Sequence, residues 1–359
     1  RVTLQPAAGA QGELAGMLVI RAWHEARGSK RTKVLIPDTA HGTNPATASL
    51  TGYDVVPIAS EGILTLEEVE AHMNDDVAAL MVTNPNTLGL FETNIEAICK
   101  LVHERGGMVY CDGANLNALM GIARPGDMGI DVMHFNLHKT FSTPHGGGGP
   151  GSGPVGVTEE LIPYLPGPGV KRDGPGVGRD GEGYRFGSAN ADSIGRMMAF
   201  HGNVGIMVRA YAYIRSMGPA GLKYASEMAV LNANYVRARL EGVYDLPYKS
   251  RSLHEVIFSD KDLEGGCHTL DVAKRLIDYG YHPPTIYFPL VVKGAIMIEP
   301  TETESQEILD EFCDAMVAIA GEARDNPDLL QQAPSRSKVR RLDETTAARK
   351  PKLKWEGSP

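Results

Sequence analysis

Lys139 stands where a short apolar run meets a glycine-rich loop. Residues 132–137, which we predict to form a strand, end at the pair His138-Lys139, and the sequence HGGGGP follows at 145–150. A lysine withdrawn from water loses its proton readily and forms Schiff bases. Most lysines after a strand are instead solvated caps, and that interpretation stays open on these residues alone. The side chains that the fold brings next to Lys139 decide between the two.

The composition bounds the possible functions. A chain of 359 residues is long enough for two domains and a large core. Its 42% hydrophobic and 22% charged content is typical of a globular protein, and no run approaches the roughly 18 apolar residues of a membrane span. A net charge of -9 without a basic stripe argues against a nucleic-acid ligand. Four widely spaced cysteines without a CxxC pair indicate free thiols in a reducing compartment: Cys99, Cys111, Cys267 and Cys313.

Polar residues follow the predicted strands of the first half of the chain. Strands alternate there with helical patterns, which indicates a parallel sheet covered by helices. We predict the strands at 33–37, 53–58, 77–82, 107–111 and 132–137, and helices at 65–72 and 94–104. Ligands of such sheets bind beyond the carboxyl ends of the strands. The residues at or just past these ends should therefore share one rim: His41, Thr83, Asp112 and Lys139. Taken singly, His41 is more often a hydrogen-bonded loop histidine, and Asp112 a turn carboxylate.

A glycine-rich turn, Gly9-Ala10-Gln11-Gly12, opens a predicted helix that runs to about Trp23. Backbone N–H groups and the helix dipole make such a start attractive to an anion. An ordinary loop is the commoner explanation of this turn by itself. Together, a Schiff-base lysine, an aspartate one strand away and an anion-binding helix start are what a pyridoxal phosphate site requires.

The second half of the chain has a different pattern. Residues 163–187 are rich in Gly and Pro and predict a long loop, and residues 192–240 are mostly helical. Strands at 255–259, 285–288 and 295–298 and helices at 269–279 and 304–320 predict a small α+β layer. We therefore predict a large domain at 1–240, a small C-terminal domain at 241–330 and a basic tail at 331–359, which is solvated or docks on a partner subunit.

Several motifs in order resemble one family. They are Gln5–Glu13, Asp38–Ala46, Thr83–Gly89, Asp112–Asn115 and the stretch 132–150, and together they span most of the first 190 residues. The sequence resembles the glycine decarboxylase P-proteins of the glycine cleavage system, which are fold-type I enzymes dependent on pyridoxal phosphate. Its length and basic ending are most similar to the second (β) subunit of the two-subunit bacterial type. The implied fold is α/β, with a fold-type I transferase-like large domain and a small α+β domain.

The resemblance implies roles for individual residues. Lys139 looks like the lysine that carries pyridoxal 5'-phosphate, and Asp112 like the aspartate that pairs with its pyridinium nitrogen. His41 looks like the histidine that stacks on the cofactor ring, with Ala114 on the opposite face. The turn that binds the phosphate would be Gly9, Ala10 and Gln11, and further cofactor neighbours would be Thr87 and His138.

The resemblance also implies an activity and partners. The enzyme, an oxidoreductase, would decarboxylate glycine and pass the aminomethyl group to the lipoyl group of the H-protein, and its partner would be P-protein subunit 1 (α). It would be cytoplasmic in a bacterium or archaeon. Because the chain opens at Arg1 near a ligand loop, we expect a missing N-terminal portion, which leaves mitochondrial targeting open. Residues 163–187 would line the entrance for the lipoyl arm, and the glycine run 146–149 would reach a neighbouring subunit's site.

Three alternatives remain at this point. Another fold-type I amino-acid decarboxylase would share the lysine, the aspartate and the histidine. A non-catalytic partner subunit would have a related fold, although the presence of both Lys139 and Asp112 argues against it. A metal site at His134 and His138 is a weak third alternative, since their spacing on a strand gives no tetrahedral closure.

Overall fold

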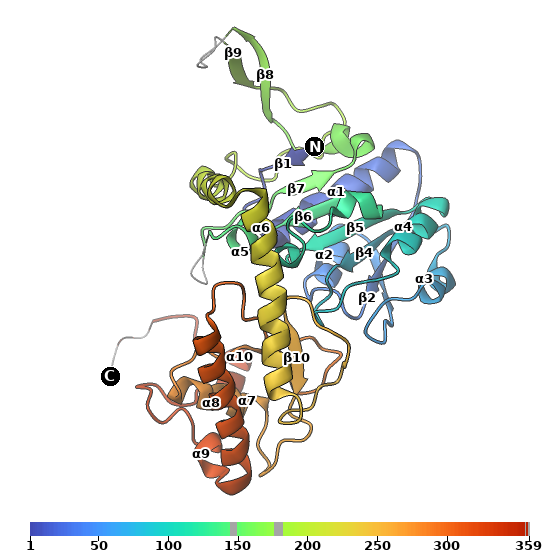
Figure 1. Ribbon diagram of the computed structural model, residues 1–359. Coiled ribbons are helices and arrows are strands. Elements are labelled where there is room, and N and C mark those ends of the chain that lie inside the picture. Colours follow the sequence, from blue (N-terminus) through green and yellow to red (C-terminus); the bar gives the residue numbers. More distant parts are fainter. Residues whose placement is uncertain (144–148, 176–181, 356, 358–359) are drawn as a thin grey trace. The chain divides into compact units, whose positions relative to one another are not determined.

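The computed structural model describes residues 1–143, 149–175, 182–355 and 357 (Figure 1). Its Cα positions group the chain into two compact units, of which the first comprises residues 1–235, 248–256 and 299–304 and the second comprises the rest. The late segments belong to the first unit because Leu253 N donates to Gly89 O at 2.7 Å and Asn232 Nδ2 donates to Thr301 O at 2.8 Å. The unit boundaries thus cross the chain several times, whereas the sequence pattern predicted one boundary after residue 240 and another after residue 330.

The first unit is built around a seven-stranded sheet in the order β1-β7-β6-β5-β4-β2-β3 (Figure 1). Its strands are β1 (Val2–Thr3), β2 (Lys33–Pro37), β3 (Asp54–Ile58), β4 (Val77–Thr83), β5 (Met108–Gly113), β6 (Val132–Phe135) and β7 (Val155–Val157). The five strands from β6 to β3 run parallel, and β7 pairs antiparallel with both β6 and β1. The predicted α/β fold with a mostly parallel sheet is confirmed.

Helices alternate with the strands, as the sequence pattern predicts, and α2 (Asn44–Leu50), α3 (Leu66–His72) and α4 (Ile95–Glu104) connect parallel strands. The other helices are α1 (Gly9–Ala26) before β2 and α5 (Leu137–Thr140) after β6, with short 3-10 turns η1 (Leu116–Ala118), η2 (Pro125–Met128) and η3 (Glu159–Tyr164). Thr65 starts α3, since its hydroxyl accepts a hydrogen bond from Glu68 N at 3.2 Å. Such local signals explain why the predicted helix bounds lie close to the observed ones.

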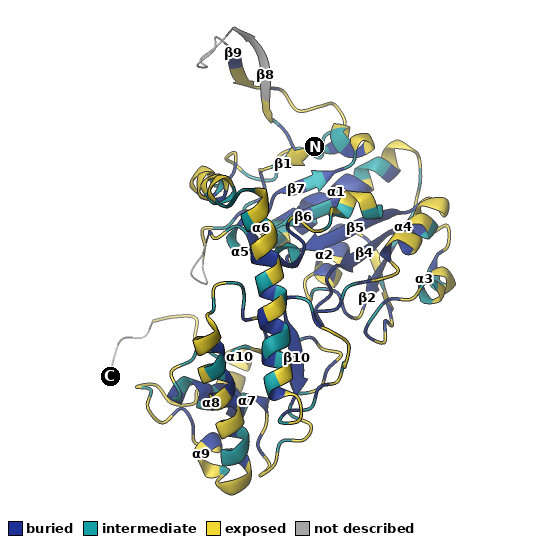
Figure 2. Cartoon of the chain, in the orientation of Figure 1, coloured by how far each residue is buried: buried dark blue, intermediate teal, exposed yellow. Residues whose placement is uncertain are grey.

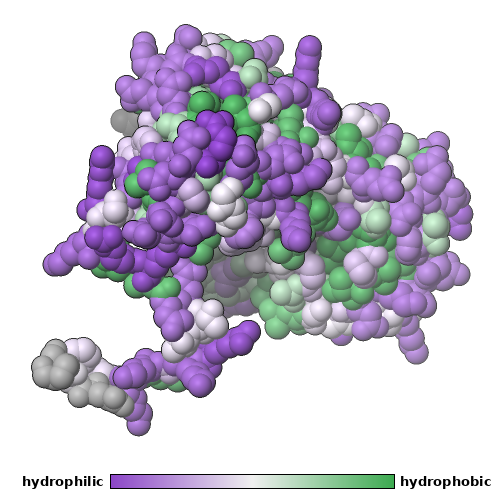
Figure 3. Space-filling model, turned by 90° about the horizontal axis from the view of Figure 1, so that it is seen from below, coloured by the Kyte–Doolittle hydropathy of each residue, from purple (hydrophilic) through white to green (hydrophobic). Residues whose placement is uncertain are grey.

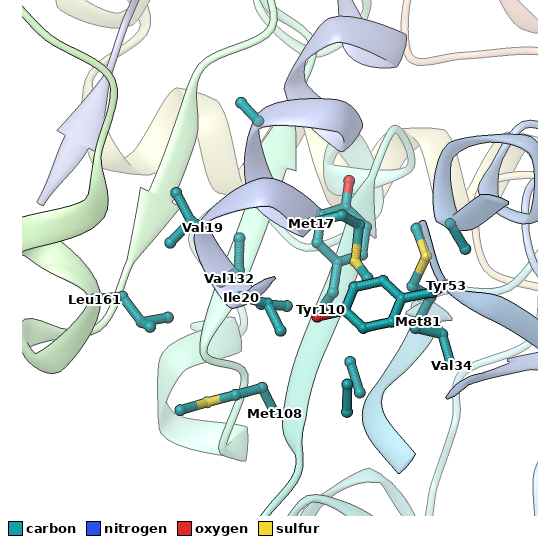
Figure 4. Packing of buried hydrophobic residues seen from close by; sticks show 14 of the residues in the cluster. Met17, Val19, Ile20, Val34, Tyr53, Met81, Met108, Tyr110, Val132 and Leu161 are labelled. Atoms are coloured by element: carbon teal, nitrogen blue, oxygen red, sulfur yellow. The ribbon is translucent and has the colours of Figure 1, made fainter. Parts of the chain in front are cut away.

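The two faces of the sheet bury alternate residues of each strand, because side chains of a strand point to opposite faces. On one face, Val34 and Tyr110 pack with Met17 and Ile20 of α1, and Figure 4 shows these side chains meeting between helix and sheet. On the other face, Leu35 packs in a second cluster with residues of α3 and α4. Figure 2 shows the central strands β4 and β5 in dark blue, as strands covered on both faces must be.

Two local predictions are wrong. The strand predicted at 132–137 ends at Phe135, and Lys139 lies in the short helix α5 instead of directly at the strand end. The long loop predicted at 163–187 contains an antiparallel pair, β8 (Val170–Pro175) with β9 (Glu182–Phe186). Residues 192–240 are mostly helical, as predicted, because α6 (Val204–Leu240) covers 37 of them; the helix is interrupted at Gly218, whose φ is 62° and which precedes Pro219. The glycine run at 146–148 lies outside the described residues.

The second unit holds a small sheet and several helices, as predicted for the α+β layer. The sheet has the order β10-β12-β11 and consists of β10 (Val256–Ser259), β11 (Thr285–Ile286) and β12 (Ala295–Ile298), although Val256 itself groups with the first unit. The helices are α7 (Thr269–Asp278), α8 (Gln306–Asp325), α9 (Asp328–Gln331) and α10 (Glu344–Arg349). Part of the predicted tail is anchored here: Asp278 accepts a hydrogen bond from Arg336 N at 2.7 Å, and Arg341 pairs with Asp271 at 2.7 Å.

Hydrophilic residues cover much of the molecular face in Figure 3, with apolar residues between them. Within the described part of the chain, no helix combines the length and the apolar character needed to cross a membrane.

Candidate functional site

The carboxyl ends of the parallel strands bring the predicted site residues together. Thr83, the last residue of β4, is in register with Asp112 of β5, and Asp112 is in register with His134 of β6. His41, four residues past β2, donates its backbone N–H to the Thr83 hydroxyl at 3.0 Å. The predicted common rim is thus confirmed for His41, Thr83 and Asp112, and β6 leads from the same rim into the helix that carries Lys139.

Asp112 is a buried carboxylate held by fixed donors. Its Oδ1 accepts a hydrogen bond from Ala114 N at 2.9 Å, and its Oδ2 accepts one from Asn44 Nδ2 at 3.0 Å. Burial would raise the pKa of this carboxyl, but His134, His41 and the two hydrogen bonds together hold the pKa below its ordinary value. Asp112 therefore stays negatively charged at neutral pH, although its side chain is only 1% exposed.

His134 supports Asp112 from behind, a role that the sequence did not reveal. Its Nδ1 lies 2.5 Å from the Tyr110 hydroxyl, and its Nε2 lies 3.4 Å from Asp112 Oδ1. Burial raises the pKa of Tyr110 far above its ordinary value, so this hydroxyl keeps its proton and donates it to Nδ1. Because Nδ1 accepts this proton, Nε2 is the ring nitrogen that presents an N–H to the carboxylate.

Glu13 forms a second buried carboxylate centre on α1. It accepts hydrogen bonds from Thr43 Oγ1 at 2.5 Å, Asn44 Nδ2 at 3.0 Å and Thr47 Oγ1 at 3.0 Å. Because Asn44 donates to both Glu13 and Asp112, this network ties the start of α1 to the strand-end aspartate. Glu13 and Asn44 both lie inside the motifs that carry the family resemblance, and that was the available signal for them.

The predicted anion-binding turn forms the first turn of α1. Gly12 N donates to Ala8 O at 2.9 Å, so the amides of Gly9, Ala10 and Gln11 precede the first intrahelical hydrogen bond of the helix. The Gln11 side chain fixes the turn, since its Oε1 accepts from Ala7 N at 2.8 Å and its Nε2 donates to Met197 O at 3.0 Å. Gln11 therefore has its backbone, and not its side chain, available for an anion.

Because Gly12 and Gly153 have no side chains, this turn lies directly against β6 and against the segment after the glycine run. A Cβ on Gly12 would stand 2.9 Å from Gly153 O and 3.0 Å from His134 Cβ. A Cβ on Gly153 would stand 2.1 Å from Ala8 O. Real Cβ atoms do not approach backbone oxygens so closely, so glycine is required where these segments cross.

Gly9 gives a direct test of the turn. In Gly9→Ala, the added Cβ would stand 2.6 Å from Asn136 Oδ1 and 3.2 Å from His134 Nε2. Overpacking costs about 1–3 kcal/mol, and much of it should appear as a displaced turn. We expect about tenfold weaker binding of pyridoxal phosphate, measured by equilibrium titration of the apoprotein. Gly126→Ala is the matched control, since no atom of the described residues lies within 4 Å of its added Cβ; equal affinity of both variants would contradict a phosphate role for the turn.

Lys139 lies on α5 with its side chain exposed, so burial by the protein alone does not desolvate its amine. The charge of Lys139 nevertheless acts on two buried groups, lowering the pKa of Glu255 and of His254. Neighbouring His138 is half-buried, and its Nδ1 accepts a hydrogen bond from Ser152 N at 3.2 Å. His134 and His138 thus have different hydrogen-bond partners, which removes the support for a metal site made by this pair.

The other predicted cofactor neighbours lie on the same rim. The Thr87 hydroxyl donates to Thr39 O at 2.9 Å, which orders the loop after β4 against the loop after β2. Ala114 is buried directly after β5, where its amide caps Asp112.

The residues present fit pyridoxal phosphate. The donor set offers what this molecule needs: an amine for its aldehyde, a charged carboxylate for its pyridine nitrogen and a helix start for its phosphate. Buried polar atoms without a hydrogen-bond partner among the described residues lie near the helix start, including Asn136 Oδ1, beside Gly9, and Ser152 Oγ. Such atoms are costly unless a ligand or water satisfies them.

A second group of titratable side chains lies near Lys139 and was missed by the sequence reading. His254, Glu255 and Glu299 place one ligand-type atom each within 4.8 Å of one another. They come from segments of the first unit that lie more than a hundred residues beyond Lys139, and no motif in the sequence links them to it.

Comparison with known proteins gives close relatives. The chain is 59% identical over 359 residues to glycine dehydrogenase (decarboxylating) subunit 2 of Exiguobacterium sibiricum, covering 99% of this chain and 72% of that protein. It is 57% identical to the protein of the same name from Chlorobium chlorochromatii, covering 97% of this chain and 72% of that protein.

Family and structural matches agree with these relatives. Residues 225–337 match the family described as glycine dehydrogenase, C-terminal domain, and residues 11–149 match aminotransferase class-V. A crystal structure of glycine decarboxylase (P-protein) of the glycine cleavage system in inhibitor-bound form matches with a TM-score of 0.72 at 20% identity, covering 88% of this chain and 70% of that one. A cysteine desulfurase from Thermococcus onnurineus matches with a TM-score of 0.66 at 19% identity, covering 89% and 79%. At these identities the structural matches establish the shared fold.

Proposed function

This chain belongs to the family of glycine dehydrogenase (decarboxylating) subunit 2, and from this premise we propose that it decarboxylates glycine with pyridoxal 5'-phosphate. The aminomethyl group that remains passes to the lipoyl group of the H-protein. The observation that carries the proposal is the position of two residues on neighbouring elements. A charged Asp112 lies on β5, and Lys139 lies just past the adjacent β6, both inside the stretch that matches aminotransferase class-V.

Bound pyridoxal phosphate supplies an aldehyde that joins an amino group and a pyridine ring that takes up electrons from a breaking bond. Lys139 would hold the cofactor through its amine. Its exposed position on α5 supports this role, because a cofactor and a substrate can both reach its Nζ. The same Nζ would take up or release a proton.

Asp112 holds the proton of the pyridine nitrogen in place. A carboxylate that stays ionised at neutral pH stabilises a positive charge beside it, and burial in a low dielectric strengthens that attraction. His134 and Asn44 fix the two carboxylate oxygens, so the charge is oriented before any substrate arrives. Tyr110 orients His134 in turn.

The remaining site residues position the cofactor. His41 Nδ1 lies 3.9 Å from Asp112 Oδ2, and its half-exposed ring would stack on the cofactor ring. Ala114, whose amide donates to Asp112 Oδ1, would lie on the opposite face of that ring. The first amides of α1, at Gly9, Ala10 and Gln11, bind the phosphate, and Thr87 and His138 line the same rim.

The proposed partners follow from the family. The name subunit 2 implies a second subunit, and we propose that this is subunit 1 (α) of the P-protein. Lipoylated H-protein is the acceptor and glycine the substrate. Residues 163–187, which include the β8–β9 pair, are our candidate for the entrance used by the lipoyl arm. We propose a cytoplasmic location, as for an enzyme of bacterial type.

The comparisons and the site argue against the two alternative functions, another fold-type I amino-acid decarboxylase and a non-catalytic subunit. Another amino-acid decarboxylase of this fold would not explain 56–59% identity to glycine dehydrogenases over nearly the whole chain. A non-catalytic subunit would have no need for a lysine just past β6 together with a preorganised, charged Asp112 on the adjacent β5.

Exchange of labelled carbon dioxide with the carboxyl group of glycine tests the proposed function. We expect exchange by the purified protein with subunit 1, pyridoxal phosphate and lipoylated H-protein. Omission of subunit 1 or of the lipoyl group should reduce the rate at least about tenfold, because each completes the reaction. A complete mixture that exchanges other amino acids but not glycine would refute the substrate assignment.

A further inference from the structure

His254, Glu255 and Glu299 form what we call the His254 cluster. Glu255 and His254 directly precede β10, and Glu299 directly follows β12, yet all three group with the first unit. Their ligand-type atoms lie within 4.8 Å of one another. Asn117 of η1 donates to Glu299 Oε1 at 3.1 Å, and η1 packs against α5, the helix that carries Lys139. The cluster therefore lies beside the helix of the lysine, in agreement with the effect of the Lys139 charge on the pKa of His254 and of Glu255.

Glu255 is the weakly hydrogen-bonded carboxyl group of the cluster, whereas Glu299 has a hydrogen bond of ordinary length. Asn115 Nδ2 lies 3.5 Å from Glu255 Oε1, and Asn117 Nδ2 donates to Glu299 Oε1 at 3.1 Å. Asp112, by contrast, is held by two donors within 3.0 Å. A buried carboxylate without strong donors is costly, so the neutral form of Glu255 is favoured.

Burial raises the pKa of Glu255 well above its ordinary value, the charge of Glu299 raises it further, and Lys139 lowers it. Glu255 therefore holds a proton under conditions in which an ordinary glutamate has lost it. The titratable groups that act on Glu255 are thus Glu299, Lys139 and, at 3.8 Å from its Oε2, His254 Nε2.

His254 is the unusual member of the cluster. Its side chain is fully buried, and neither ring nitrogen has a hydrogen-bond partner among the residues that the structure describes. Burial lowers the pKa of His254, so the ring is neutral and offers one acceptor and one donor nitrogen. Unpaired buried nitrogens destabilise the fold, so a protein retains such groups most readily where they serve a function.

Lys139 needs a nearby site for a proton. An amine must lose a proton before it attacks an aldehyde carbon, and it gains one when it is released. We propose that Glu255 and Glu299, supported by His254, hold one exchangeable proton beside Lys139 and exchange it with the Lys139 amine. An N–H bond of the ammonium breaks as an O–H bond of the carboxyl pair forms, and the reverse transfer restores both, so no proton is consumed in a turnover.

This inference rests on the proposed function, because it requires that Lys139 binds pyridoxal phosphate. The test is the rate at which the full apoprotein forms its Schiff-base absorbance band with pyridoxal phosphate, measured by stopped flow from mildly acidic to mildly alkaline pH. We expect Glu255→Gln to slow band formation about tenfold or more at neutral pH and to remove one ionisation from the pH profile. The final amplitude of the band should be unchanged, because Gln resembles the neutral carboxyl in size.

Further variants separate proton exchange from a structural effect. Glu92→Gln is the matched control, because burial also raises the pKa of Glu92 but its neighbours are Asn86, Leu64 and Asp38. It should keep the profile of the wild type. Glu299→Gln, at an exposed position, should shift the ionisation of Glu255 towards acid, since it removes the charge that raises that pKa; this variant also serves if Glu255→Gln fails to fold.

The outcomes distinguish the two proposals. A wild-type protein that forms no band overturns the proposed function and this inference together. A wild-type band with Glu255→Gln and Glu299→Gln profiles identical to it overturns the inference alone. If Glu255→Gln reacts more slowly but its pH profile keeps every ionisation of the wild-type profile, the effect is structural. That result likewise overturns proton exchange.

Discussion

Lys139→Ala is expected to abolish the Schiff-base band of the protein with pyridoxal phosphate and to reduce glycine–carbon dioxide exchange by at least about a thousandfold. The amine forms the covalent bond to the cofactor, and nothing else in the described site carries a primary amine at that position. The fold should survive, since Lys139 is exposed on a four-residue helix. Absorbance spectra and exchange rates of the two proteins, at matched thermal midpoints, measure the effect.

Two comparisons make this result specific to the amine. Lys139→Arg keeps the positive charge but forms no Schiff base, so it should lose the band as completely as the alanine variant. Lys100→Ala, on the exposed side of α4 where Lys100 pairs with Glu104, should retain both the band and the rate. Borohydride reduction of the wild type should fix the cofactor mass on the peptide that contains Lys139. Labelling of a different lysine would refute the assignment.

The common rim could be predicted because strands that alternate with helices form a parallel sheet. In such a sheet the carboxyl ends of all the strands lie at one edge. β2, β4, β5 and β6 each read as short apolar runs, and the polar residues after them had to meet at one edge. The chemistry of Asp112 followed from this placement. Its charge state did not, because it depends on His134 and His41, which only the pairing of β5 with β6 and the loop after β2 bring close.

Other features could not be read from local sequence. The helix that carries Lys139 has only four residues, too few to show a helical period of apolar residues. The apolar run before it therefore predicts a strand that continues to Leu137. The β8–β9 pair is dense in Gly and Pro, a composition that predicts a loop. Its strands are defined only by their pairing with each other, which the local sequence does not show. The His254 cluster assembles residues more than a hundred positions from Lys139, and a single sequence carries no signal for that proximity.

Asp112→Asn is expected to reduce glycine–carbon dioxide exchange by about a hundredfold to ten-thousandfold, which corresponds to about 3–5 kcal/mol of lost charge stabilisation. Asn is close in shape to Asp, so the contact with Ala114 N can remain while the charge is lost. Asn44 cannot satisfy the new amide without turning away from Glu13, to which it also donates. The loss should therefore combine the missing charge with a disturbed network around α1.

The pH dependence separates these two contributions. The pKa of Asp112 lies below its ordinary value, so the carboxylate stays charged from neutral pH down through mildly acidic pH, and it should cause no acid limb near neutrality. Asp112→Asn should thus lower the rate by a similar factor at every pH in that range. Asp131→Asn is the matched control: Asp131 is a buried aspartate before β6, at the opposite end of the parallel strands, where it accepts from Val109 N and pairs with His103 at 2.7 Å. It should lower the thermal midpoint but keep the exchange rate per folded molecule, because a buried aspartate at that end of the strands faces no ligand. Equal losses of exchange in the two variants would mean that Asp112 acts through stability alone.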